Sequence, residues 1–355
     1  MRERIYTIDA LKGLAILLVV FGHAFQGNLT NFDDNVVFRV IYSFHMPLFM
    51  FLAGLVAVYN IENPVISYLT KKFLALVVPF ISWYALDYFV TGAYHSIAVK
   101  TYIARIISSP DWGLWFLWVL FLNYCLLVLS VKMEKGLGIY AFLITFLLVL
   151  WCPVGILGIW VLKKFFFYFA LGYLFMKYRN ILNEYLSQIK YSVIVIFPLL
   201  AFQWHMKKGF AFAQDVKNFF SGIGIQFLSE YFLYTCSIAV AVSGIVCAYL
   251  FIEAIKRNFI HRYLCWLGGY TLDIYVCHHL FLGYGFGTGT TRILSTAIMA
   301  LIISLLISIL VLRRIKILNM LFLGGRKNTE GQEGLNRVEI FDRWRILLTK
   351  SLQKI

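Results

Sequence analysis

Three histidines occupy similar depths near the ends of long apolar segments, a placement that suits proton transfer. His23 lies four residues before the end of the apolar segment 8–27. His45 lies five residues into the segment 40–59, and His278 lies five residues before the end of the segment 264–283. With a rise of about 1.5 Å per residue, all three imidazoles fall about 6–8 Å inside one membrane boundary. Imidazoles exchange protons near neutral pH, and a helical bundle could gather three into one polar chamber. His23, His45 and His278 are therefore the candidate catalytic residues.

Two other interpretations apply to these histidines. Taken singly, a residue such as His45 or His279 is more often an interfacial histidine bonded to a neighbouring helix than a catalytic group. A zinc site is the second alternative, but no acidic or cysteine ligand has suitable spacing nearby, so no metal is expected. The agreement in depth of three histidines on three segments favours proton transfer over both alternatives.

Basic residues gather at the opposite ends of the same apolar segments. Lys12 stands near the start of the first segment, three residues after Asp9, a spacing at which the two side chains can pair on one helix face. Lys71 and Lys72 precede the third segment. Lysines at these positions either set membrane topology or form an anion-binding mouth for a phosphorylated donor. Lys12, Lys71 and Lys72 are accordingly the candidate donor-binding residues.

The overall composition places these groups in a membrane protein. Of the 355 residues, 61% are hydrophobic and 14% are charged, whereas soluble domains contain roughly 45–50% apolar and about 25% charged residues. This composition excludes soluble single-domain enzymes, disordered scaffolds and disulfide-rich secreted modules. The net charge of +15 would favour nucleic-acid binding in a soluble protein. In a membrane protein it is the positive-inside signal, so the bilayer and not a nucleic acid is the expected partner.

Ten apolar segments have lengths that approach or reach the roughly 20 residues of a membrane span. They cover residues 8–27, 40–59, 73–91, 112–130, 137–152, 158–176, 191–204, 231–252, 264–283 and 293–312. Ten crossings put both termini on one side, and with cytoplasmic termini the inner side holds 23 Lys and Arg against nine outside. The sequence predicts an all-α, multi-pass transmembrane bundle with both termini cytoplasmic, in a cell membrane.

Two parts of the chain are distinguished by this pattern. Residues 1–312 form the predicted transmembrane domain, and residues 313–355 form a cytoplasmic tail. Within the tail, residues 324–336 are rich in Gly and Asn and resemble a linker. From Val338 to Leu352, apolar residues recur at helical spacing with basic residues between them. This amphipathic helix is expected to lie either on the inner membrane surface or against the bundle.

Two acids also lie inside apolar segments, Asp87 in the third and Asp273 in the ninth. A charged side chain inside a membrane costs free energy and therefore needs a partner. Either acid could orient a histidine, but bridging between helices is the favoured role.

The segment from Ile8 to His23 resembles the opening signature of the acyltransferase 3 family of integral-membrane acyltransferases. That signature has an Asp, then an Arg, then ten residues, then a His. Here ten residues separate Lys12 from His23. The Lys in place of Arg resembles the signature of one branch of the family, the branch that is similar to fucose 4-O-acetylases. Lysine keeps the positive charge of arginine but not its two-pronged hydrogen bonding.

Further motifs of the family follow in the expected order. They are Phe44–Gly54, Lys71-Lys72 before Pro79, Leu114–Leu117, Phe166–Tyr173 and Tyr270–His278. With the opening signature, the six motifs cover most of residues 5–312.

The resemblance implies a ten-helix enzyme that takes an acyl group, commonly acetyl from acetyl-CoA, on the cytoplasmic side. The implied acceptor is a hydroxyl of a surface glycan or of its lipid-linked precursor, in a bacterial cytoplasmic membrane. His23 would be the general base or would carry the acyl group itself. The alternative is a transporter or flippase for a glycan or small acid that performs no chemistry, which broken helices in paired positions would support.

Overall fold

The computed structural model describes residues 6–59, 61, 64–108 and 113–325. The regular secondary structure of these residues is helical apart from one antiparallel hairpin, β1 (Trp204–His205) and β2 (Gly209–Phe210). The α-helices are α1 (Tyr6–Asn28), α2 (Val36–Ala57), α3 (Val65–Lys72), α4 (Val78–Val90), α5 (Val99–Ser108), α6 (Trp115–Leu137), α7 (Tyr140–Trp151), α8 (Ile159–Lys177), α9 (Arg179–Gln203), α10 (Ala213–Gly222), α11 (Phe227–Ala254), α12 (Phe259–Gly268), α13 (Thr271–Cys277), α14 (Gly289–Ile307) and α15 (Lys316–Leu323). Short 3₁₀- or π-helical stretches are η1 (Phe32–Asp34), η2 (Phe73–Val77), η3 (Ala93–His95), η4 (His278–Phe281) and η5 (Ser308–Leu312).

The predicted all-α class is confirmed, and most predicted spans correspond to apolar helices. Seven helices of the described residues are long and apolar enough to cross a membrane, among them the continuous runs Val65–Val90 and Gly289–Leu312. Two predicted spans correspond to shorter apolar helices, Tyr140–Trp151 and Tyr191–Gln203. The number of crossings and the side on which each end lies stay predictions.

The ninth predicted span, residues 264–283, is not one continuous helix. It begins within α12, which ends at Gly268, is interrupted at Gly269 and Tyr270, and continues as α13 and η4. Two consecutive glycines weaken a helix because they lack side-chain packing and cost backbone entropy. Gly268 also lies against α1 so closely that an added Cβ would overlap the carbonyl of Asp9. The helix is therefore interrupted next to the place where α12 packs against α1.

Glycines bring α1 and α2 close to their principal neighbours. Gly13 of α1 packs on the backbone of Leu264 in α12. Gly54 of α2 and Gly172 of α8 each lie against the backbone of the other helix, where a Cβ would overlap a carbonyl oxygen. Small residues at helix crossings are how membrane helices gain packing energy, since lipid tails are as apolar as leucine.

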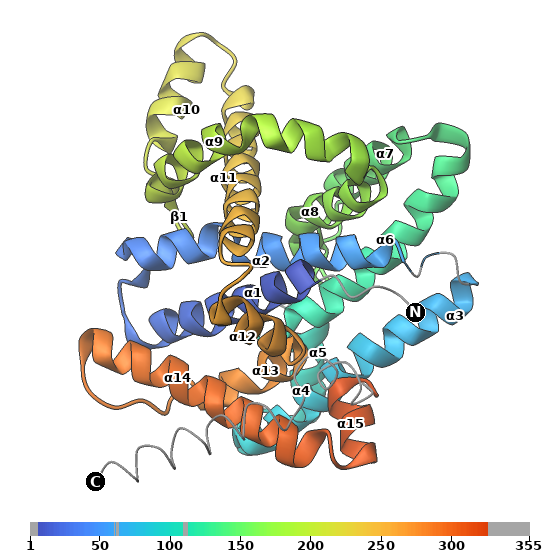
Figure 1. Ribbon diagram of the computed structural model, residues 1–355, viewed down its shortest axis with the longest axis vertical. Coiled ribbons are helices and arrows are strands. Elements are labelled where there is room, and N and C mark those ends of the chain that lie inside the picture. The colour runs from blue at the N-terminus through green and yellow to red at the C-terminus, as the bar shows by residue number, and fades with distance from the viewer. Residues whose placement is uncertain (1–5, 60, 62–63, 109–112, 326–355) are drawn as a thin grey trace.

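α1 and α2 lie at the centre of the molecule (Figure 1). They are the most buried of the seven long helices. Figure 1 shows α9, α10 and α11 beyond one side of this central pair and α14 and α15 beyond the other. A polar side chain on the buried face of α1 or α2 is consequently surrounded by protein.

Residues just after the last predicted span pack on the bundle. Helix α15 contacts α4, where the indole Nε1 of Trp83 donates a hydrogen bond to the carbonyl of Phe322 at 2.9 Å. Leu323 is fully buried there. Of the predicted linker, Gly324 and Gly325 are described; its remainder and the predicted amphipathic helix lie outside the described residues.

Candidate active site

Two of the three predicted histidines are neighbours. The imidazoles of His23 on α1 and His278 in η4 lie with ring centroids 5.3 Å apart and planes inclined by 38°. His278 is 2% exposed, and His23 is half-buried. Residues 255 positions apart in the chain thus share one location, which depth along a helix alone does not ensure.

His45 joins this pair through Tyr42, which lies one turn earlier on α2. The Tyr42 and His45 rings are 4.5 Å apart, and the Tyr42 hydroxyl lies 3.3 Å from Nδ1 of His23. His45 is 2% exposed, and its Nδ1 donates to the carbonyl of Ile41 at 2.9 Å. His23, Tyr42, His45 and His278 are called the histidine cluster below.

Gln26 and Tyr42 determine which nitrogen of His23 carries the proton. The Tyr42 hydroxyl donates to Oε1 of Gln26 at 2.9 Å, so its own proton is directed away from His23. Nδ1 of His23 lies 3.3 Å from both the Gln26 and the Tyr42 oxygens, which are left as acceptors. Nδ1 is therefore the donor, and in the neutral imidazole Nε2 carries a free lone pair that can accept a proton.

His278 is oriented by its own backbone. Its Nδ1 donates to the carbonyls of Ile274 at 3.0 Å and Tyr275 at 2.8 Å. Both acceptors are within reach because the chain tightens from α13 into the 3₁₀ turn η4 at this residue. As in His45, a bound Nδ1–H leaves Nε2 as the acceptor nitrogen of the neutral ring.

A buried ion pair anchors the helix that leads to His278. Oδ2 of Asp273 on α13 lies 2.6 Å from Nε of Arg313, and Ser308 of η5 donates to the same oxygen. The guanidinium also donates to the carbonyl of Gly269 at 2.8 Å and covers the ring of Tyr270. Asp273 thus bridges α13 to the end of the last long helix. Arg313, expected at the start of the tail, is part of the bundle.

Asp87 also has a bridging contact. Its carboxylate accepts a hydrogen bond of 3.1 Å from the Tyr102 hydroxyl, which ties α5 to α4. Both acids therefore bridge helices and make no direct hydrogen bond to a histidine of the described residues.

The three predicted lysines lie on two helices, Lys12 on α1 and Lys71 and Lys72 at the end of α3. Lys12 of α1 pairs with Asp9 at 3.6 Å, as its spacing predicts. Lys72 ends α3, and its ammonium group stands 4.0 Å from the ring centroid of Tyr124 on α6. Lys71 is exposed beside it. The histidines are thus brought together, whereas Lys12 is not on the same element as the Lys71–Lys72 pair.

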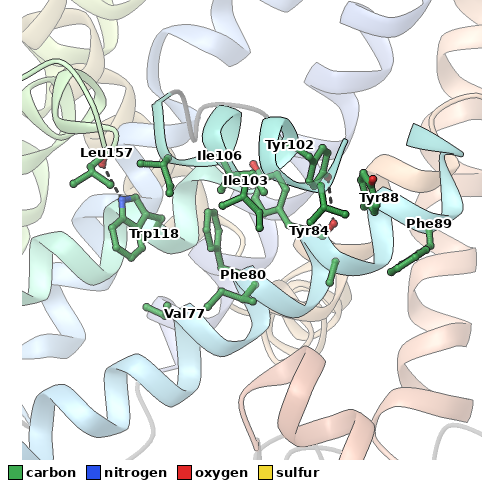
Figure 2. A pocket seen from close by; sticks show the side chains of 14 residues that line it. Val77, Phe80, Tyr84, Tyr88, Phe89, Tyr102, Ile103, Ile106, Trp118 and Leu157 are labelled. Atoms are coloured by element: carbon green, nitrogen blue, oxygen red, sulfur yellow. Dashed lines mark hydrogen bonds between the residues drawn. The ribbon is translucent and has the colours of Figure 1, made fainter. Parts of the chain in front are cut away.

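An apolar groove of about 520 Å³ lies beside α4 and does not include the histidine cluster among its lining residues. Aromatic and aliphatic side chains of α4 and α5 form its walls, and Trp118 of α6 donates to the carbonyl of Leu157 at one end (Figure 2). Trp83, on the same helix α4, lies edge-on to His279 at 6.5 Å. α4 is therefore an element common to the groove and the surroundings of the cluster.

Tyr42 and Gln26 were not predicted as site residues. Both lie three residues from a predicted histidine on the same helix, the spacing at which helical side chains contact each other. That spacing is the sequence signal that could have identified them. Among the described residues, no group of three or more His, Cys, Asp or Glu has a geometry that could hold a metal ion.

Comparisons with known proteins identify the family of the chain. A family model described as an acyltransferase domain matches residues 5–313. The nodulation protein NolL of Sinorhizobium fredii is 26% identical over 213 residues, which are 57% of this chain and 58% of that protein. NolL of Mesorhizobium japonicum is 23% identical over 207 residues, 56% of this chain and 55% of its own. The matches thus span little more than half of either relative, and no solved structure gives a significant match.

Proposed function

The chain belongs to the acyltransferase 3 family, and from that premise we propose that it is a membrane O-acetyltransferase. In this proposal it moves an acetyl group from cytoplasmic acetyl-CoA to a hydroxyl of a surface glycan or of its lipid-linked precursor. The single observation that carries the proposal is the contact between His23 and His278 inside the helical bundle. It provides basic nitrogens in a buried place, as acyl transfer to a hydroxyl requires.

His23 acts as the general base of the transfer. Its Nε2 takes the proton of the acceptor hydroxyl while the hydroxyl oxygen attacks the thioester carbonyl carbon. The resulting tetrahedral intermediate expels the CoA thiolate as the C–S bond breaks, and the proton on His23 passes to that thiolate. Ester and free CoA are the products. The same nitrogen also permits a two-step route in which His23 first accepts the acetyl group.

Gln26 and Tyr42 stabilise His23 during this step. When Nε2 gains a proton the ring becomes an imidazolium, and its Nδ1–H faces the oxygens of Gln26 and Tyr42. A hydrogen bond to a charged group is stronger than one between neutral groups. The two oxygens therefore favour the transient charge, a task that a carboxylate performs in many hydrolases.

The donor enters from the side on which Lys12 lies. Lys12 and His23 are eleven residues apart on α1, about 16 Å along the helix axis. With both termini cytoplasmic and ten crossings in the bacterial cytoplasmic membrane, the CoA phosphates meet Lys12, Lys71 and Lys72 at the inner face. The acetyl end of the bound acetyl-CoA then extends between the helices to the histidine cluster near the outer face.

The transporter alternative predicts a different outcome for the acceptor. The broken segment α12–α13 is the kind of element that transporters use, but family membership favours chemistry over transport alone.

In the test, full-length protein in lipid nanodiscs receives acetyl-CoA labelled in its acetyl group and a panel of glycan acceptors. Label found as an alkali-labile ester on a glycan, with stoichiometric free CoA, supports the proposal. Glycan movement across proteoliposomes without CoA release contradicts it.

A further inference from the structure

His278 holds a polar atom that the protein itself does not satisfy. The residue is 2% exposed, and its Nε2 is buried with no hydrogen-bond partner. Its Nδ1 already donates to two backbone carbonyls, so Nε2 of the neutral ring is an acceptor that needs a donor. Buried polar groups are nearly always bonded, because an unpaired one costs the full desolvation penalty. A hydrogen-bond donor of a bound molecule would satisfy this nitrogen.

The position of His278 limits what that donor can be. The ring lies beside His23, whose Nε2 receives the reacting hydroxyl in the proposed mechanism. Its neighbours Ile274, Val276 and Cys277 are completely buried, so the nitrogen does not face open solvent. The proton of one hydroxyl can make a near-linear, strong hydrogen bond to only one nitrogen at a time. Two acceptor nitrogens on adjacent rings are therefore satisfied best by two O–H groups, which a single molecule with neighbouring hydroxyls can supply.

We propose, on the basis of the proposed function, that Nε2 of His278 binds a second hydroxyl of the acceptor, adjacent to the one that is acylated. His23 then receives the proton of the reacting hydroxyl while His278 recognises its neighbour. The acceptor class is a sugar unit with two vicinal hydroxyls, and His278 is the residue that selects it. The recognition is rigid, since the Asp273–Arg313 pair fixes α13 and two carbonyls fix the ring.

Deoxy sugars test this assignment directly. Full-length protein in nanodiscs is supplied with acetyl-CoA and with methyl fucoside, methyl galactoside or methyl glucoside. Each glycoside is compared with derivatives that lack one hydroxyl next to the acetylated position. A site built to bind a hydroxyl rejects the analogue without it strongly, so we expect kcat/KM to fall at least about 100-fold for the deoxy acceptor.

Variants of His278 assign that preference to one residue. His278→Leu removes the acceptor nitrogen at similar volume and should reduce the preference to less than about fivefold, because the deoxy acceptor no longer leaves Nε2 unpaired. His278→Gln retains an acceptor oxygen and should preserve part of the preference. His279→Leu is the matched control: its ring lies next to His278 on the Trp83 side, and its substitution should leave the preference unchanged.

Each remaining outcome decides the question. Equal use of the parent and deoxy glycosides by the unaltered protein overturns the inference while leaving acetyl transfer intact. A His278→Leu variant that slows both acceptors by the same factor also overturns it, since that is the effect of a structural or purely catalytic role. Acetyl transfer to none of the glycosides, nor to any glycan in the panel above, contradicts the proposed function and this inference with it.

Discussion

Asp273 and Arg313, forty residues apart, form a buried ion pair with 2.6 Å between Oδ2 and Nε. Asp273 is fully buried and the arginine side chain is 10% exposed. The pair joins the broken segment that carries His278 to the end of the last long helix. The position of one ring in the histidine cluster thus depends on a contact at the other end of α13.

Removing one partner of this pair should destabilise the protein strongly. Arg313→Met leaves the Asp273 carboxylate buried without its counter-charge, and breaking a buried pair from one side costs about 3–5 kcal/mol. We expect a lower midpoint in thermal unfolding followed by size-exclusion chromatography in detergent. The double variant Asp273→Asn, Arg313→Met removes both charges and should recover part of the loss. A midpoint unchanged by Arg313→Met would show that the pair does not anchor α13.

Substitution of His23 should abolish the reaction and leave the fold intact. His23→Ala makes a membrane segment more apolar, so insertion should not suffer. A general base contributes about 10²–10⁴-fold to the rate. The rate of acetyl transfer should therefore fall by at least about 100-fold. His95→Ala, at an exposed histidine in η3, is the matched control. Near-normal acetyl transfer by a well-expressed His23→Ala protein would contradict the assignment.

The oxygens beside His23 should matter less than His23 itself. Tyr42→Phe keeps the stacking on Phe38 and His45 but removes the hydroxyl. Gln26→Leu removes the amide oxygen, whereas Gln26→Glu retains an acceptor. A net hydrogen bond contributes about 1 kcal/mol, so kcat should fall roughly fivefold in the first two variants, with little change in KM. A kcat for Gln26→Glu no better than for Gln26→Leu would argue against the orienting role.

The lysines at the end of α3 should affect the donor and not the acceptor. A Lys71→Gln, Lys72→Gln variant removes two positive charges, and the apparent KM for acetyl-CoA should rise at low ionic strength. The effect should shrink in salt, because exposed charges are screened beyond about 8–10 Å near physiological ionic strength. Lys100→Gln on α5 removes an exposed charge elsewhere and is the control. An unchanged donor KM would leave Lys71 and Lys72 as residues that only set topology.

From the fixed rise per residue of a helix, the sequence predicts a common level for the histidines, and their depth in the membrane stays a prediction. The contact that the structure does show is between the rings of His23 and His278, whose centroids are 5.3 Å apart. Tyr42 is different, because its role depends on the side-by-side packing of α1 and α2. No periodicity encodes which helices are neighbours, so its bond toward His23 required the fold.

Two features were missed for opposite reasons. The glycines at 268 and 269 are visible in the sequence, but the surrounding hydrophobicity outweighed them and predicted one continuous span. Arg313, in contrast, resembles the basic residues that stop a membrane segment. Its burial depends on an acid forty positions earlier, a tertiary contact that local composition does not contain.

The last prediction concerns the sides of the membrane, and it tests architecture and mechanism together. α1 has 23 residues and is about 34 Å long, enough to cross a hydrocarbon core of about 30 Å. If its start is cytoplasmic, Asn31 is outside and Lys316 is inside. Both positions are exposed, so each is replaced by cysteine in turn in a protein whose six native cysteines have been changed to alanine.

An impermeant thiol reagent applied to intact cells should label Asn31→Cys and should reach Lys316→Cys only after the cells are permeabilised. This result places His23, five residues before the end of α1, close to the outer face. The acetyl group must then travel through the bundle, because acetyl-CoA is made inside the cell. Labelling of Lys316→Cys in intact cells would invert the topology and put the histidine cluster beside the donor. Protection of both cysteines would mean that α1 does not cross, and no acceptor outside the cell could then reach His23.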